Sequence, residues 1–66
     1  MYAQYVFLRV LSALLKQGVI STEKRNNMVA LWKEDVKGHA SLLEELYSYT
    51  ENSVWREDLR KAIETC

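Results

Sequence analysis

AQYVFLRVLSALLK, the segment at residues 3–16, carries the strongest structural signal in the chain. At about 100° per residue, Arg9, Ser12 and Lys16 fall on one narrow polar strip, and Tyr5 joins them. Apolar side chains dominate the remaining arc of about 200°, roughly twice the width that a surface helix needs. The pattern therefore predicts a helix that must be covered from two sides, either by two helices of its own chain or by one helix and a partner.

The sequence after this segment predicts a helix end followed by a new helix start. Gly18 suits the left-handed position just past a helix, and Ser21 is a favourable N-cap for the next one. Glu23 then falls in the first turn, where the helix dipole favours an anion. We expect the second helix over residues 22–37, with an apolar stripe formed by Met28, Val29, Trp32 and Val36.

Residues 41–64 predict two further helices. Ser41, with Glu44 three residues later, has the spacing of a capping box and predicts a helix start. One straight helix would turn the two apolar stripes of this region about 150° apart, so we expect a break at residues 50–53. The alternative is one continuous helix whose second half faces another molecule. The two stripes are Leu42, Leu43, Leu46, Tyr47 and Tyr49, and then Trp55, Leu59, Ala62 and Cys66.

The composition agrees with one small helical domain. The chain has 66 residues, of which 48% are hydrophobic, with two glycines, one cysteine and no proline. This length fits a single domain over residues 1–66. So few glycines and prolines leave too few turn-forming residues for an all-β fold. One cysteine excludes an internal disulfide framework and a cysteine-type zinc site within one chain. The predicted fold class is all-α, a small bundle of three to four short helices.

The charges balance overall but not along the chain. Nine basic residues oppose nine acidic ones, which argues against nucleic acid as a partner because phosphate binding usually needs a basic excess. Residues 1–25 hold four bases and one acid, a net +3, and the remaining residues hold five bases and eight acids, a net −3. Such a dipolar chain favours association with itself or with a charged protein surface.

The N-terminal apolar run predicts neither a membrane span nor a secretory signal. Arg9 interrupts the run, and no basic residue precedes it as a signal peptide requires. We therefore expect no membrane partner and a cytoplasmic location, which the lone thiol of Cys66 fits.

The sequence contains no catalytic or metal-binding motif. There is no HExxH, no ExxH and no glycine-rich phosphate loop. A nucleophilic pair would require His39, the only histidine, to activate Cys66, whose thiol at the last residue is poorly placed. We predict no catalytic residue, no metal site and no cofactor, and a protein that is not an enzyme.

Four residues are candidates for partner binding. Tyr5 and Arg9 share the polar strip of the first helix, where core packing does not explain a tyrosine, and Tyr with Arg is a common pairing at binding hot spots. Trp32 lies on an apolar stripe, so the core is its first interpretation and an interface anchor its second. Asp35 falls in the apolar sector of the 22–37 helix, either as an edge-of-core acid that is paired or exposed, or as an interface acid that recognises a partner's base.

A basic patch is the main argument for a second class of function. Arg25, Arg56, Arg60 and Lys61 could gather in the fold, and Gly18 could supply the turn of a helix-turn-helix. The second helix would then present Lys24, Asn27, Glu34 and Asp35, a mixed surface that matches phosphate poorly.

Two short stretches resemble known small helical families. The pattern Leu8-x-x-Leu11-x-x-Leu14-Leu15-x-x-Gly18-Val19-Ile20-Ser21-x-Glu23, about a third of the chain, resembles the short helical hairpin called SHOCT. The stretch Leu46-Tyr47…Ser53-Val54-Trp55 resembles the end of the Hha/YmoA nucleoid modulators. Both resemblances imply a small helical protein that acts by docking, and neither assigns a functional residue here.

The expected function is that of a non-enzymatic protein–protein interaction module. It would act as a regulator or inhibitor that occupies the surface of a larger protein, and it would form a homodimer. The alternative is a small DNA-binding transcriptional regulator of the helix-turn-helix type.

Overall fold

Four α-helices and one short 3₁₀ helix form the chain in the computed structural model, which describes residues 2–66. The predicted fold class, a small all-α bundle, is confirmed. The elements are α1 (Tyr2–Lys16), α2 (Thr22–Glu34), η1 (Val36–Gly38), α3 (His39–Tyr49) and α4 (Ser53–Glu64).

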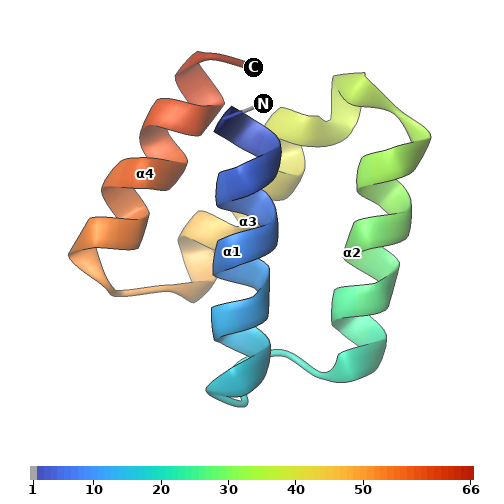
Figure 1. The fold of residues 1–66 in the computed structure, drawn as a ribbon, viewed down its shortest axis with the longest axis vertical. Coiled ribbons are helices and arrows are strands. Elements are labelled where there is room, and N and C mark those ends of the chain that lie inside the picture. The colour runs from blue at the N-terminus through green and yellow to red at the C-terminus, as the bar shows by residue number, and fades with distance from the viewer. Residues whose placement is uncertain (1) are drawn as a thin grey trace.

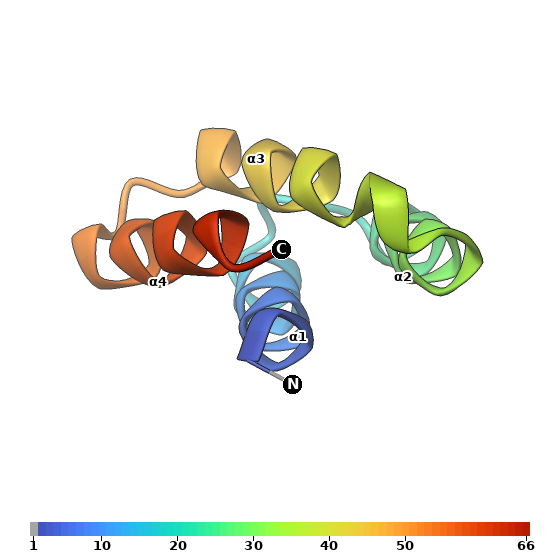
Figure 2. The same cartoon turned by 90° about the horizontal axis from the view of Figure 1, so that it is seen from above.

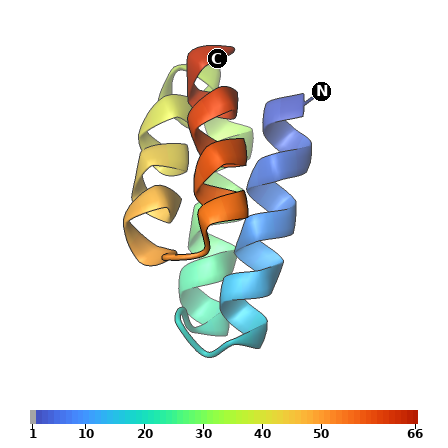
Figure 3. The same ribbon diagram turned by 90° about the vertical axis from the view of Figure 1, so that its left-hand side faces the viewer.

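Helix α1 stands between α2 on one side and α4 on the other (Figure 1). Helix α3 crosses behind α1, so that α1 contacts all three other α-helices (Figure 2). The start of α1 and the end of α4 lie at the same end of the bundle (Figure 3). Helix α2 therefore has α1 and α3 as neighbours but is separated from α4.

The core closes around the apolar arc of α1. Six residues of this helix are buried, and Phe7 is fully enclosed. Leu15 is half-buried, and Leu8 remains 41% exposed. Helices of the same chain cover most of the wide arc, so the arc itself supplies little reason for a second copy. The other core residues are Ile20, Met28, Trp32, Leu42, Leu43, Leu46, Leu59 and Ala62.

The predicted stop after α1 is confirmed in detail. Gly18 has φ +77°, the left-handed conformation that glycine adopts without a Cβ penalty. The Gly18 N–H donates to the Leu15 carbonyl at 3.1 Å, and the Val19 N–H donates to the Leu14 carbonyl at 2.9 Å, which is a Schellman motif. The Ser21 hydroxyl then accepts from the Lys24 N–H at 3.0 Å and caps α2 as predicted.

The predicted extent of the second helix is wrong, because α2 ends at Glu34. Asp35 adopts an extended backbone, and its Oδ1 accepts from the Lys37 N–H at 2.9 Å. An aspartate that bonds the backbone two residues ahead offers a turn in place of the helix. Val36 consequently leaves the apolar stripe and is 77% exposed. Asp35 does not lie in an apolar helix sector.

The predicted capping box at Ser41 is also wrong. Helix α3 begins two residues earlier, at His39, and no side chain caps it. The backbone N–H of His39 donates to the Val36 carbonyl, so η1 runs directly into α3 and satisfies part of its first turn. Ser41 is an exposed residue inside the helix.

The predicted break after α3 is confirmed. Helix α3 ends at Tyr49, and α4 starts at Ser53 with Asn52 as its N-cap. The Asn52 Oδ1 accepts from the N–H groups of Val54 and Trp55. Helix α4 therefore turns Leu59 and Ala62 into the core, whereas Tyr49 and Cys66, which were expected to share the buried stripes, are exposed.

Candidate functional site

Tyr5 and Arg9 form a direct pair on the outward face of α1. The Arg9 Nη1 donates to the Tyr5 hydroxyl at 2.9 Å, and the guanidinium carbon lies 5.8 Å from the centre of the Tyr5 ring. Both residues are exposed, and Tyr5 is 59% exposed. Helix geometry brings together these two predicted residues, one turn apart, and leaves both available to a partner.

Trp32 lies in the core of the bundle. Its indole stacks on the Phe7 ring at a centroid distance of 4.1 Å and on the His39 imidazole at 3.5 Å. The His39 Nε2–H also donates to the Trp32 carbonyl at 2.7 Å. The tryptophan is thus held between α1 and α3 and is only 7% exposed, which matches the first of its two interpretations.

Asp35 lies apart from this pair, at the junction of α2 and η1. Its carboxylate is exposed and engaged with the Lys37 backbone, as described above. The local role of Asp35 is to end one helix and start the next turn. Of the four candidates for partner binding, the structure joins only Tyr5 and Arg9.

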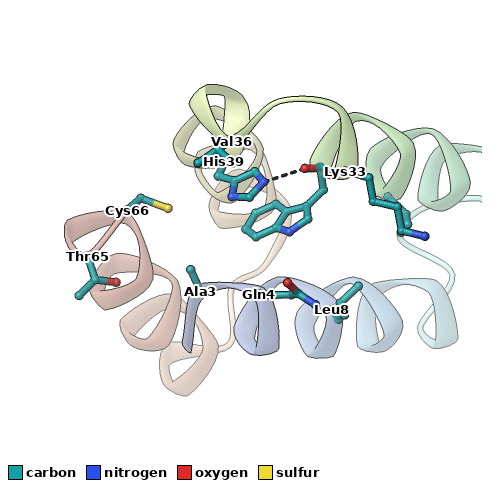
Figure 4. Close-up of a pocket in the computed structure, with 10 residues that line it drawn as sticks. Ala3, Gln4, Leu8, Lys33, Val36, His39, Thr65 and Cys66 are labelled. Atoms are coloured by element: carbon teal, nitrogen blue, oxygen red, sulfur yellow. Dashed lines mark hydrogen bonds between the residues drawn. The ribbon is translucent and has the colours of Figure 1, made fainter. Parts of the chain in front are cut away.

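A cavity of about 450 Å³ opens between α1 and the C-terminal half of α2 (Figure 4). His39 lines one side, with Trp32 stacked on it, and residues of α1 line the opposite side. Thr65 and Cys66 close one end, and the Lys33 side chain extends along the other end. The remaining lining residues are Ala3, Gln4, Leu8, Val29 and Val36.

Sequence reasoning missed this cavity, because its walls come from four parts of the chain. The early end of α2 opens the space: an uninterrupted helix through residue 37 would not have brought His39 back over Trp32. The signal that could have found it is the short Asp35-Val36-Lys37-Gly38 stretch, in which an aspartate and a glycine both favour a turn.

An exposed polar cluster links α2 to α3. The Lys24 Nζ lies 2.8 Å from the Glu45 Oε2, and the Tyr49 hydroxyl donates to the same oxygen at 2.8 Å. Hydrogen bonds from Lys24 and Tyr49 hold the pKa of Glu45 below its ordinary value. The hydrogen bond to Glu45 in turn raises the pKa of Lys24 and that of Tyr49. The cluster fastens two helices and does not face the cavity.

The expected basic patch is largely occupied by contacts within the chain. The Arg56 guanidinium lies 4.0 Å from the centre of the Tyr47 ring, and its Nη1 donates to the Thr50 carbonyl at 3.0 Å. Lys61 pairs with Glu57. The Arg25 Nη1 donates to the Asn26 side chain at 2.8 Å. These contacts orient Arg25, Arg56 and Lys61 locally, whereas Arg56 and Arg60 line one pocket together with the acidic Glu57.

Two kinds of feature do not occur in the described part of the chain: a cluster of metal-binding side chains and a helix able to cross a membrane. Across residues 2–66, no three His, Cys, Asp or Glu side chains come close enough together to bind a metal ion. No helix in that range has both the length and the apolar character needed to cross a membrane.

No family model, curated protein or solved structure matches the chain. Neither the SHOCT nor the Hha/YmoA resemblance therefore gains support. The site is defined by its own geometry, which provides an exposed tyrosine–arginine pair and, beside it, an apolar cavity with one cation at its end.

Proposed function

We propose that the chain is a non-enzymatic docking module that binds an acidic surface of a partner protein through the outward face of α1. The observation that supports this most directly is the Tyr5–Arg9 pair, in a helix that contains no acidic residue. A guanidinium already positioned by a neighbouring phenol loses little conformational freedom when it binds a carboxylate in a bidentate manner.

Apolar area beside the pair supports the same proposal. Tyr2, which also belongs to α1, is 45% exposed. Tyrosine and arginine are the residue types that most often dominate the binding energy of an interface. A complementary partner would present carboxylates around a small apolar centre, and binding would cover the partner's surface as a regulator or inhibitor does.

A second copy of the chain is the competing occupant of this face. Residues 26–66 carry a net charge of −3, so a head-to-tail dimer has some charge complementarity. However, the chain covers most of the apolar arc of α1 itself, and a few exposed side chains offer little area for a permanent homodimer. We therefore favour a larger partner protein over self-association.

The test compares three immobilised forms of the chain in an extract of the native host. They are the wild type, the Arg9→Glu variant and the control variant Arg60→Glu, which reverses an exposed charge on α4. Quantitative mass spectrometry then measures which proteins each form retains. We expect at least one protein that the wild type and the control retain equally and that Arg9→Glu loses by about tenfold, because a repulsive charge replaces a pairing one.

Three results would contradict the proposal. One is that no retained protein distinguishes Arg9→Glu from Arg60→Glu. Another is a dimer of the wild type in sedimentation experiments that Arg9→Glu dissociates, which would assign the face to a second copy. The third is a salt-sensitive shift of duplex DNA by the purified chain, which would favour the alternative of a DNA-binding regulator.

A further inference from the structure

We infer that the cavity between α1 and α2 binds a small amphiphile, with an apolar tail against Leu8 and Val29 and a single anionic head beside Lys33. This is a ligand site distinct from protein docking by the outward face of α1. The inference rests on the apolar walls of the cavity, on the one charge that lines it and on the rigidity of its central wall.

The walls of the cavity match an apolar ligand. Its volume of about 450 Å³ falls within the usual range for small-molecule sites, which are lined mainly by apolar and aromatic side chains. Leu8 lines the cavity from α1, and Val29 and Val36 add apolar lining from α2 and η1. Each of these three aliphatic side chains retains exposed surface that a ligand would remove from water.

The polar groups of the cavity match a single anionic head. Among the ten described side chains that line the cavity, Lys33 is the one lysine or arginine, and none is an aspartate or glutamate. Its side chain extends at the end of the cavity away from Cys66 (Figure 4). A carboxylate placed there would pair with the ammonium while staying close to solvent, so its desolvation cost is small.

The central wall is already in place before a ligand arrives. Trp32 is held between Phe7 and His39, and its carbonyl accepts from the His39 ring, as described above. A preformed aromatic wall spares the ligand the free-energy cost of ordering it. Lys33 and Cys66 lie at opposite ends of the cavity (Figure 4), so a chain-like tail can extend from one end towards the other.

The experiment uses three ten-carbon probes that share a tail and differ in the head. Decanoate, 1-decanol and decylammonium are each titrated, below their micelle-forming concentrations, into the isotopically labelled full chain and followed by amide NMR. We expect decanoate to bind most tightly and to shift the amides of Leu8, Lys33 and Cys66. Decanoate should also slow the reaction of the Cys66 thiol with a thiol reagent, because Cys66 lines the cavity.

Two matched pairs of variants separate the head from the tail. Lys33→Gln should weaken decanoate about three- to fivefold and leave decanol unchanged, whereas Lys37→Gln in η1 should change neither. Leu8→Gln should weaken both probes by at least fivefold, whereas Leu31→Gln, which alters an exposed leucine outside the cavity, should change neither.

The outcomes that overturn the inference are specific. Amide shifts for decanoate that spare the cavity residues would show that the cavity takes no such ligand. Decylammonium binding as tightly as decanoate, or an unchanged decanoate affinity in Lys33→Gln, would refute the anionic head. Because none of these measurements involves Arg9 or a partner protein, their failure would leave the docking proposal untouched.

Discussion

At the scale of single residues, two side chains determine how α2 meets α3. Asp35 ends α2 by bonding the backbone of Lys37, and His39 returns over Trp32 to stack on its ring and bond its carbonyl. His39, which the sequence suggested only as a candidate activator of Cys66, therefore fixes the angle between two helices. Its position depends on the turn that precedes it, so no periodicity in the sequence could reveal it.

The two glycines provide a residue-scale prediction because their backbones differ. Gly18→Ala should lower the free energy of unfolding by about 1 kcal/mol, since alanine is strained at φ +77° although open space surrounds its Cβ. Gly38→Ala should be neutral or stabilise by about 0.5 kcal/mol, because Gly38 has φ −85° and equal space. Urea denaturation of both variants measures the difference. Equal effects would show that the left-handed cap after α1 is not maintained in solution.

At the scale of elements, the sequence predicted which helices exist better than where they begin and end. The apolar period located α1, and the divergence of two stripes located the break between α3 and α4. The errors fall where a side chain bonds the backbone nearby, at Asp35, or where one helix runs into the next, at His39. Such local hydrogen bonds compete with helix formation, and the spacing of the apolar residues does not reveal them.

A prediction at this scale compares Asn52, the N-cap of α4, with Ser41, which the sequence predicted as the cap of α3. Asn52→Ala should destabilise the chain by about 1 kcal/mol, because the Asn52 side chain accepts from two backbone N–H groups of α4. For a domain of this size, that loss lowers Tm by about 4–8 °C. Ser41→Ala should change Tm little, because Ser41 lies inside α3 and caps nothing. A larger loss in Ser41→Ala than in Asn52→Ala would contradict these helix starts.

The polar cluster of Lys24, Glu45 and Tyr49, which links α2 to α3, predicts that the stability of the chain depends on pH. The pKa of Glu45 is held low in the folded chain, so the stability that its ionised form contributes is present near neutral pH. That contribution is lost as pH falls through the lowered pKa. Glu45→Gln should therefore be less stable than the wild type at pH 7, and the two should converge once the pH falls below the lowered pKa of Glu45. Glu44→Gln, at an exposed position next to it, should show a smaller difference at pH 7 in the same urea titrations. If the difference in free energy of unfolding between the wild type and Glu45→Gln grew as the pH fell, the prediction would be contradicted.

At the scale of the whole molecule, the bundle is unevenly held together. Helix α1 buries six residues and lies at the centre, whereas α2 buries only Met28 and Trp32. Figures 1 and 2 show α2 at one side of the bundle, separated from α4 by α1. The sequence could predict the outward Tyr5–Arg9 pair from helix geometry alone, but not the cavity, because its lining comes from α1, α2, η1, the start of α3 and the C-terminal residues.

Uneven packing predicts the order in which the helices open. Segments with few buried apolar contacts exchange their amide hydrogens at low free-energy cost, whereas core helices exchange near the global free energy of unfolding. Amides from Val29 to Glu34 should therefore exchange before those at the centre of α1, from Val10 to Leu14, in native-state hydrogen exchange followed by NMR. Decanoate in the cavity would touch both helices, so it should slow exchange in the α2 segment more than a general stabiliser would, and Leu8→Gln should abolish that extra protection. Protection of the α2 segment equal to that of α1 in the free chain would mean that the bundle opens as one unit, and that the two walls of the cavity are held together as firmly as the core itself.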